Sequence, residues 1–173
     1  MNILSRFRSI KTFVLDMDGV LTDGTVLIED DGKWLRKMNI RDGYALQLAI
    51  RSGYNIVVIS GSESLPVKER LQKLGVTEVF MKINNKEDFL KDYILKNNIP
   101  ADQMLFMGDD IPDYSCMITA GFACCPSDAA IEIKQVSSYI STMRGGYGCV
   151  RDVIEKVLKL NNHWPLETSV PST

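Results

Sequence analysis

Apolar residues along the chain gather in short β-rich runs, and longer segments with a helical spacing lie between them. The runs cover residues 12–16, 55–60, 78–80, 104–109 and 122–125. Such an alternation is typical of a parallel sheet, because each parallel strand needs a crossover connection that a helix can supply. We therefore predict an α/β fold: a Rossmann-like, doubly wound parallel sheet with helices on both faces.

Four segments show the helical spacing most clearly. They cover residues 42–53, 63–75, 85–98 and a stretch that begins near residue 149. In the second of these segments, Pro66 suits a first helical turn and Gly75 suits a C-terminal cap. These signals support helices of ordinary length between the strands.

Two segments depart from the alternation. Residues 24–39 hold two alternating runs joined by EDDGK, which predicts a β-hairpin with an Asp-Gly turn after the first strand. Residues 162–173 show no period and are expected to form an extended tail. The intervals between the other elements are too short for an inserted cap domain. We therefore expect a single domain over residues 1–161, without a cap.

Composition and charge exclude several classes of function. The chain has 173 residues, of which 45% are apolar and 24% charged, and its net charge is −2. Without a basic footprint, neither nucleic acid nor an anionic membrane is expected as a partner. There is no secretory signal and no run of about 18 apolar residues, so we expect a cytoplasmic protein. The four cysteines lack a C-x-x-C pair and are expected to be buried free thiols. A single histidine makes a Ser-His-Asp mechanism hard to assemble.

Polar side chains follow the strands where each strand ends. The first strand runs into Asp16, Asp18 and Gly19, the second into Ser60 and Gly61, and a later one into Gly108, Asp109, Asp110 and Asp113. Lys86 opens the helix that precedes that later strand. Because the carboxyl ends of parallel strands meet at one edge of a sheet, we expect these side chains to converge. Side chains alternate along a strand, so Asp16 and Asp18 are expected to point to the same side.

Several carboxylates around one point indicate a hard cation with oxygen ligands, and Mg²⁺ fits best. We predict Asp16, Asp18 and Asp109 as its ligands. A metal, the Ser60 hydroxyl and Lys86 would together hold a phosphate group and spread its charge. Asp16 would then be the nucleophile that forms an aspartyl-phosphate, and Asp18 would act as general acid and base.

The motifs DMDGVLTDG, ISGS, Lys86 and GDDIPD, in this order, resemble the four motifs of the haloacid dehalogenase superfamily. Most members of that superfamily are phosphatases that use an aspartyl-phosphate. Three further segments, NIRDGYALQLA, VKERLQKLGV and RGGYGCVRDVIEKVLK, are similar to the subgroup that dephosphorylates 3-deoxy-D-manno-octulosonate 8-phosphate in lipopolysaccharide sugar synthesis. The resemblance implies Mg²⁺ dependence, a sugar-acid phosphate as substrate, and a homotetramer whose substrate lies between subunits.

One position departs from the family pattern. Ser62 follows the second motif where such phosphatases often carry Arg and a related nine-carbon sugar-acid phosphatase carries Glu. A charged substrate contact must then come from elsewhere, and Arg suits a carboxylate. The candidate substrate contacts are Arg41, Asp42 and Arg70, together with Asp18, Gly61 and Lys86. Asp110 and Asp113 could either support the metal site or cap a helix, and the sequence does not decide between these two roles.

Purely structural roles for some of these residues, and other functions for the protein, stay open at this point. Ser60 could simply cap a helix, and Lys82 or Lys91 could take the place given to Lys86. Other candidate functions are a phosphatase of a nine-carbon, sialate-type sugar acid and, more remotely, a receiver-type phosphoacceptor switch. Because no cap fits, we expect the roof of the site to come from another subunit, with the hairpin as a contact. The glycines of RGGYG are expected to let that loop approach a ligand.

Overall fold

The computed structural model describes residues 2–165. Its main sheet has six strands, all paired in parallel, in the order β5-β4-β1-β6-β7-β8. The strands are β1 (Thr12–Leu15), β4 (Asn55–Ile59), β5 (Glu78–Phe80), β6 (Met104–Met107), β7 (Phe122–Cys125) and β8 (Tyr139–Ile140). The predicted parallel sheet is confirmed, and β1 lies at its centre, where the order of the strands reverses.

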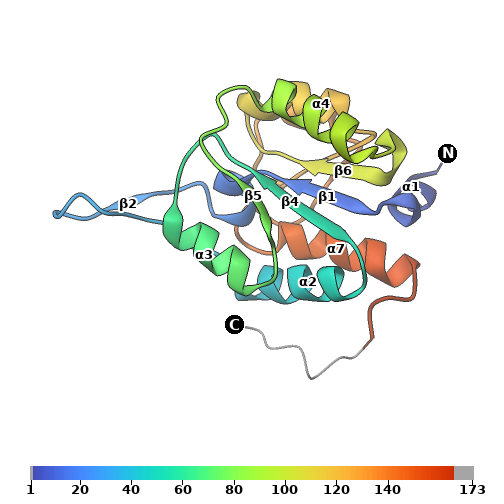
Figure 1. Cartoon of the computed structure of the whole chain (residues 1–173), viewed down its shortest axis with the longest axis horizontal. Coiled ribbons are helices and arrows are strands. Elements are labelled where there is room, and N and C mark those ends of the chain that lie inside the picture. Colours follow the sequence, from blue (N-terminus) through green and yellow to red (C-terminus); the bar gives the residue numbers. More distant parts are fainter. Residues whose placement is uncertain (1, 166–173) are drawn as a thin grey trace.

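Seven α-helices cover the sheet in the described part of the chain. They are α1 (Ile3–Ser9), α2 (Ile40–Arg51), α3 (Leu65–Lys73), α4 (Lys86–Asn97), α5 (Tyr114–Thr119), α6 (Ile131–Val136) and α7 (Cys149–Leu160). Helix α4 lies on one side of the sheet, and α2 and α7 lie on the other (Figure 1). The buried core divides accordingly: Phe13 and Leu15 of β1 pack with α2 and α7, and Val14 packs with α4. Helices therefore cover both faces, as predicted.

The four longer helices follow the predicted segments, and their ends have local causes. Helix α2 begins two residues before the predicted start, because the Asn39 side chain accepts a hydrogen bond from Arg41 N at 2.8 Å and caps the helix. Pro66 lies in the first turn of α3, and Gly75 follows its end with φ +91°. The short helices α1, α5 and α6 and the strand β8 were not predicted.

The predicted hairpin is present and projects away from the domain (Figure 1). Its strands β2 (Leu27–Ile28) and β3 (Trp34–Leu35) are antiparallel. Gly32 has φ +84° in the turn, where its N–H bonds to Glu29 O at 2.9 Å. Leu27 and Ile28 are each 63% exposed, which is unusual for apolar side chains on a strand. Residues 2–165 contain no cap domain, in agreement with the prediction.

The described end of the chain packs back onto the domain. The Trp164 ring lies edge-on to Tyr44, with 5.9 Å between the ring centroids, and His163 Nδ1 lies 3.0 Å from the Tyr54 hydroxyl. The predicted tail thus begins with contacts, and its remainder, residues 166–173, lies outside the described residues.

The four cysteines are buried and unbridged, as predicted. Among the described helices, none has the length and apolar character needed to cross a bilayer.

Candidate active site

A tight turn at the end of β1 shapes the centre of the site. After Asp16 the chain enters the turn Met17–Leu21, in which Gly19 has φ +87°. A Cβ on Gly19 would lie 2.0 Å from Asp109 Oδ2. Glycine is required here for two reasons, the positive φ and the close approach of the Asp109 carboxylate.

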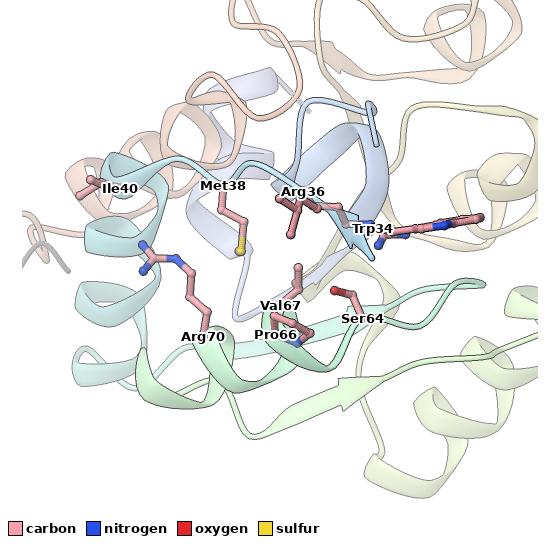
Figure 2. A pocket seen from close by; sticks show the side chains of 9 residues that line it. Trp34, Arg36, Met38, Ile40, Ser64, Pro66, Val67 and Arg70 are labelled. Atoms are coloured by element: carbon pink, nitrogen blue, oxygen red, sulfur yellow. The ribbon is translucent and has the colours of Figure 1, made fainter. Parts of the chain in front are cut away.

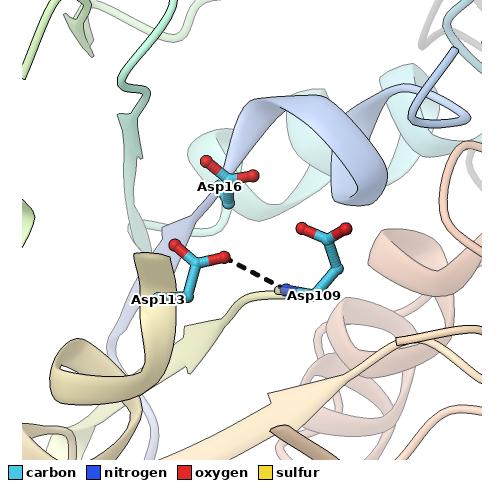
Figure 3. A group of neighbouring side chains, drawn as sticks. All are labelled: Asp16, Asp109 and Asp113. Atoms are coloured by element: carbon cyan, nitrogen blue, oxygen red, sulfur yellow. Dashed lines mark hydrogen bonds between the residues drawn. The ribbon is translucent and has the colours of Figure 1, made fainter. Parts of the chain in front are cut away.

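Three carboxylates meet beside this turn. Oxygen atoms of Asp16, Asp109 and Asp113 lie within 4.8 Å of one another, and the three side chains face a common point (Figure 3). Asp113 Oδ2 also accepts a hydrogen bond from Asp109 N at 3.1 Å, which fixes the loop after β6. Asp16 and Asp113 are buried, so the cluster is not an ordinary solvated acidic patch.

Lys86 is the cation of this cluster. It is the first residue of α4, and its Nζ donates to Asp16 Oδ1 at 2.5 Å and to Asp113 Oδ1 at 2.7 Å. The competing Lys82 and Lys91 are exposed and pair with glutamates elsewhere. Of the three lysines considered from the sequence, only Lys86 reaches the carboxylates.

The cluster carries more negative charge than the protein compensates. Burial and repulsion by Asp113 raise the pKa of Asp16, although Lys86 opposes this shift. Burial and the charges of Asp113 and Asp110 raise the pKa of Asp109 to about 7. Burial alone would lower the pKa of Lys86, but the two carboxylates raise it well above its usual value. One ammonium cannot balance three carboxylates, and this donor set fits a divalent cation with oxygen ligands such as Mg²⁺.

The Asp18 side chain lies apart from the three carboxylates. Its Oδ1 accepts from Arg36 Nε at 2.7 Å and from Thr22 Oγ1 at 3.3 Å, and its Oδ2 accepts from Ser62 Oγ at 2.7 Å. Burial raises the pKa of Asp18, but the hydrogen bonds from Arg36 and Ser62 outweigh it, and the pKa lies below its usual value. Sequence reasoning missed Arg36 as a residue of the site. The available signal was its position where the hairpin returns towards the strand ends.

A cavity of about 310 Å³ joins these groups. It is lined by Asp16, Asp18, Gly24, Ser60, Gly61, Ser62, Lys86, Asp109, Asp110, Pro112 and Asp113. Ser60 is buried, and its Oγ accepts from Ser62 N at 3.1 Å, so it shapes the loop that follows β4. Asp110 is exposed and caps the next turn by accepting from Ile111 N at 2.8 Å. The structure thus brings together the predicted residues at the strand ends.

Three predicted substrate contacts lie outside this cavity. Arg70 lines a neighbouring groove of about 390 Å³, where it and Met38 point into the space between α3 and the segment after the hairpin (Figure 2). Arg41 lines another groove, of about 570 Å³, beside the start of α7. Asp42 is buried, and its Oδ1 accepts from Arg151 N at 2.7 Å, which caps α7.

The RGGYG loop contacts the turn that carries Asp18. A Cβ on Gly145 would lie 1.8 Å from Gly19 O, and a Cβ on Gly146 would lie 2.4 Å from Asp23 N. Gly146 N also donates to Val20 O at 2.9 Å. We expected these glycines to admit a ligand. In the structure they admit the backbone of the turn at residues 19–23, and the approach of this loop to a ligand stays a prediction.

Comparison with known proteins places this geometry in a family. No protein-family model matches the chain. The 3-deoxy-D-manno-octulosonate 8-phosphate phosphatase KdsC of Escherichia coli K12 is 29% identical over 157 residues, which cover 91% of this chain and 84% of that protein. A structure from Legionella pneumophila assigned to the HAD superfamily, subfamily III A, is 26% identical, with a TM-score of 0.89 over 92% of this chain and 88% of that one.

A second solved structure is more similar in sequence. It is the 3-deoxy-D-manno-octulosonate 8-phosphate phosphatase of Moraxella catarrhalis in complex with a magnesium ion, a phosphate ion and KDO. It is 32% identical, with a TM-score of 0.89 over 93% of each chain. The chain belongs to the haloacid dehalogenase superfamily. Within it, the chain falls in the subgroup of the 3-deoxy-D-manno-octulosonate 8-phosphate phosphatases.

Proposed function

We propose that this protein is a Mg²⁺-dependent phosphatase that hydrolyses 3-deoxy-D-manno-octulosonate 8-phosphate to 3-deoxy-D-manno-octulosonate and phosphate. The observation that carries the proposal is the cavity in which Asp18 and Lys86 lie beside the acidic cluster of Asp16, Asp109 and Asp113. The relative from Moraxella catarrhalis, which is similar over 93% of this chain, holds magnesium, phosphate and KDO together.

Asp16, Asp109 and Asp113 would hold the metal, because their oxygens already converge and their charge is only partly balanced. Bound Mg²⁺ would neutralise these carboxylates and polarise the phosphoryl oxygens. The sequence predicted Asp18 as a third ligand in place of Asp113. Both oxygens of Asp113 also accept hydrogen bonds, from Lys86 and from Asp109 N, so existing partners do not decide between Asp113 and Asp18. Asp113 is favoured because its oxygens converge with those of Asp16 and Asp109, and Asp18 stays a prediction as a ligand.

The reaction assigned to these residues has two steps. In the first, an oxygen of Asp16 attacks phosphorus and the bond to the ester oxygen breaks. The negative charge of the bound phosphate would oppose the ionised form of Asp18, and the protonated Asp18 gives its proton to the departing alkoxide. In the second, Asp18 takes a proton from a water that attacks the aspartyl-phosphate, and the bond from phosphorus to Asp16 breaks. Lys86 would hold Asp16 in place and offset the charge of the phosphoryl group. Ser60 and Gly61 would shape the phosphate end of the cavity.

Arg70 is the best supported contact for the substrate carboxylate. Its Nη2 is buried without a hydrogen-bond partner among the described residues, and it lies in the groove beside Arg36. A buried guanidinium nitrogen without an acceptor favours an anionic ligand. Arg41 and Asp42 stay predictions as substrate contacts, and Asp42 already has a structural role as the cap of α7.

We further propose that the protein works as a homo-oligomer, a tetramer by the family resemblance, in the cytoplasm. The exposed apolar side chains of the hairpin support self-association. They are Val26, Leu27, Ile28, Trp34 and Leu35. Contiguous exposed apolar surface on a thin hairpin is costly in water, and a second copy would cover it. Sedimentation at several protein concentrations tests the assembly.

Phosphate release from a panel of esters tests the activity. The panel holds 3-deoxy-D-manno-octulosonate 8-phosphate, a nine-carbon sugar-acid phosphate, a hexose phosphate and a nucleotide, each with Mg²⁺ and with EDTA. We expect Mg²⁺-dependent release that is fastest with the eight-carbon ester. A preference for the nine-carbon ester would mean that the assigned substrate is wrong. Phosphate release that EDTA does not affect would overturn the proposal.

A further inference from the structure

One charged contact joins the hairpin to the catalytic cavity. Arg36 directly follows β3, and its side chain is only 5% exposed. Its Nε donates to Asp18 Oδ1 at 2.7 Å and its Nη2 to Asp18 Oδ2 at 3.3 Å. The guanidinium thus binds both oxygens of one carboxylate, which is the strongest and most directional kind of side-chain pair.

Asp18 needs this support more than the neighbouring Asp16 does. Its side chain is 36% exposed, whereas that of Asp16 is 7% exposed. It also lies in a turn with φ −81° and ψ 121°, not in the regular backbone of β1. Its other partners, Thr22 and Ser62, are neutral hydroxyls. Without Arg36, the carboxylate would have access to rotamers that face solvent.

The contact also ties the catalytic carboxylate to the position of the hairpin. The hairpin base is anchored by the bridge between Thr22 and Met38, and Arg36 lies beside this bridge on the returning strand. Arg36 Nη2 reaches Ser62 Oγ at 3.4 Å as well, so one guanidinium connects the hairpin with the loops that follow β1 and β4.

We propose that Arg36 is the positioning residue for Asp18, through which the hairpin sets the geometry of proton transfer to the leaving group. This inference rests on the proposed phosphatase activity and on the role given there to Asp18. Its consequence depends on the substrate. A sugar alkoxide leaves poorly and needs a well-placed proton donor, whereas an aryl oxide leaves readily without one.

The test compares kcat for 3-deoxy-D-manno-octulosonate 8-phosphate and for p-nitrophenyl phosphate in the full-length protein with Mg²⁺. The variants are Arg36→Gln, Arg36→Lys, Asp18→Asn and the double variant Arg36→Gln/Asp18→Asn. The control is Lys33→Gln, because Lys33 is on the same hairpin and, within residues 2–165, forms its ion pair with the exposed Asp31 alone. Thermal unfolding and sedimentation check folding and assembly. If Arg36→Gln does not fold, Arg36→Lys is compared with wild type in its place.

We expect Arg36→Gln to lower kcat on the sugar phosphate by at least ~10-fold and on the aryl phosphate by less than about threefold. Arg36→Lys keeps the charge but loses the paired contact, so its loss should be intermediate. The double variant should be no slower than Asp18→Asn, because both changes remove one function. Lys33→Gln should behave as wild type.

Two outcomes overturn the inference alone: equal losses on both substrates, or losses that multiply in the double variant. Each would mean that Arg36 acts independently of Asp18. A wild-type protein that hydrolyses neither ester overturns the proposed function, and the inference fails with it.

Discussion

Replacement of Asp42 by Asn should change how stability depends on pH. Asp42 is 2% exposed; its Oδ1 caps α7, and its Oδ2 is buried without a hydrogen-bond partner in the described part of the chain. Burial raises the pKa of Asp42 to about 6, although the Arg151 N–H opposes the shift. Asn keeps the acceptor that caps α7 and removes the buried charge.

The size of the effect follows from the difference in pKa between the folded and unfolded chain. The pKa rises from 3.8 to about 6, and each unit corresponds to ~1.4 kcal/mol, so the total is about 3 kcal/mol. The folded state binds the proton more tightly than the unfolded state. Asp42 therefore contributes this stability below pH 3.8, and the contribution is lost as the pH rises through about 6.

Urea unfolding, followed by circular dichroism between pH 4 and pH 7.5, measures the effect at fixed salt and protein concentration. We expect the free energy of unfolding of Asp42→Asn, relative to wild type, to rise by about 2.4 kcal/mol across this range, because the rest of the about 3 kcal/mol is reached only below pH 4. Other titrating groups cancel in the difference. Asp92→Asn, at an exposed position of α4, controls for the change in net charge. A difference that stays flat with pH would refute the reasoning.

Three further predictions concern the site. Asp16→Asn should lower turnover by at least ~10³-fold with an unchanged circular dichroism spectrum, because an amide is a poor nucleophile; turnover within tenfold of wild type would contradict the role. Asp109→Ala should raise the Mg²⁺ concentration needed for half-maximal activity by ~10-fold or more, while Asp110→Ala should leave it nearly unchanged; equal titrations would contradict the ligand assignment. Gly145→Ala should lower both the melting temperature and turnover, since its Cβ would lie 1.8 Å from Gly19 O; a wild-type melting temperature would show that the loop yields freely.

Element length decided how much of the fold could be predicted. Helices α2, α3, α4 and α7 have at least nine residues, enough turns for an apolar stripe to repeat. Helices α5 and α6 have six residues each, and β8 has two. A segment of one or two turns shows no period. These short helices form because Met117 and Ile133 pack against the sheet. Such packing cannot be read from the sequence.

The end of β1 explains which carboxylates of the site could be predicted. Alternation along a strand placed Asp16 and Asp18 on one side, but β1 ends at Leu15 and the backbone turns at Gly19. Alternation does not continue through a turn, so the Asp18 carboxylate pairs with Arg36 of the hairpin while it lines the same cavity as the acidic cluster. Asp113, whose role the sequence left open, lies beside Asp16, because the short helix after Asp110 returns it to the strand ends. Residues at strand ends can thus be assigned to a site from sequence, whereas the direction of each side chain depends on where the strand stops.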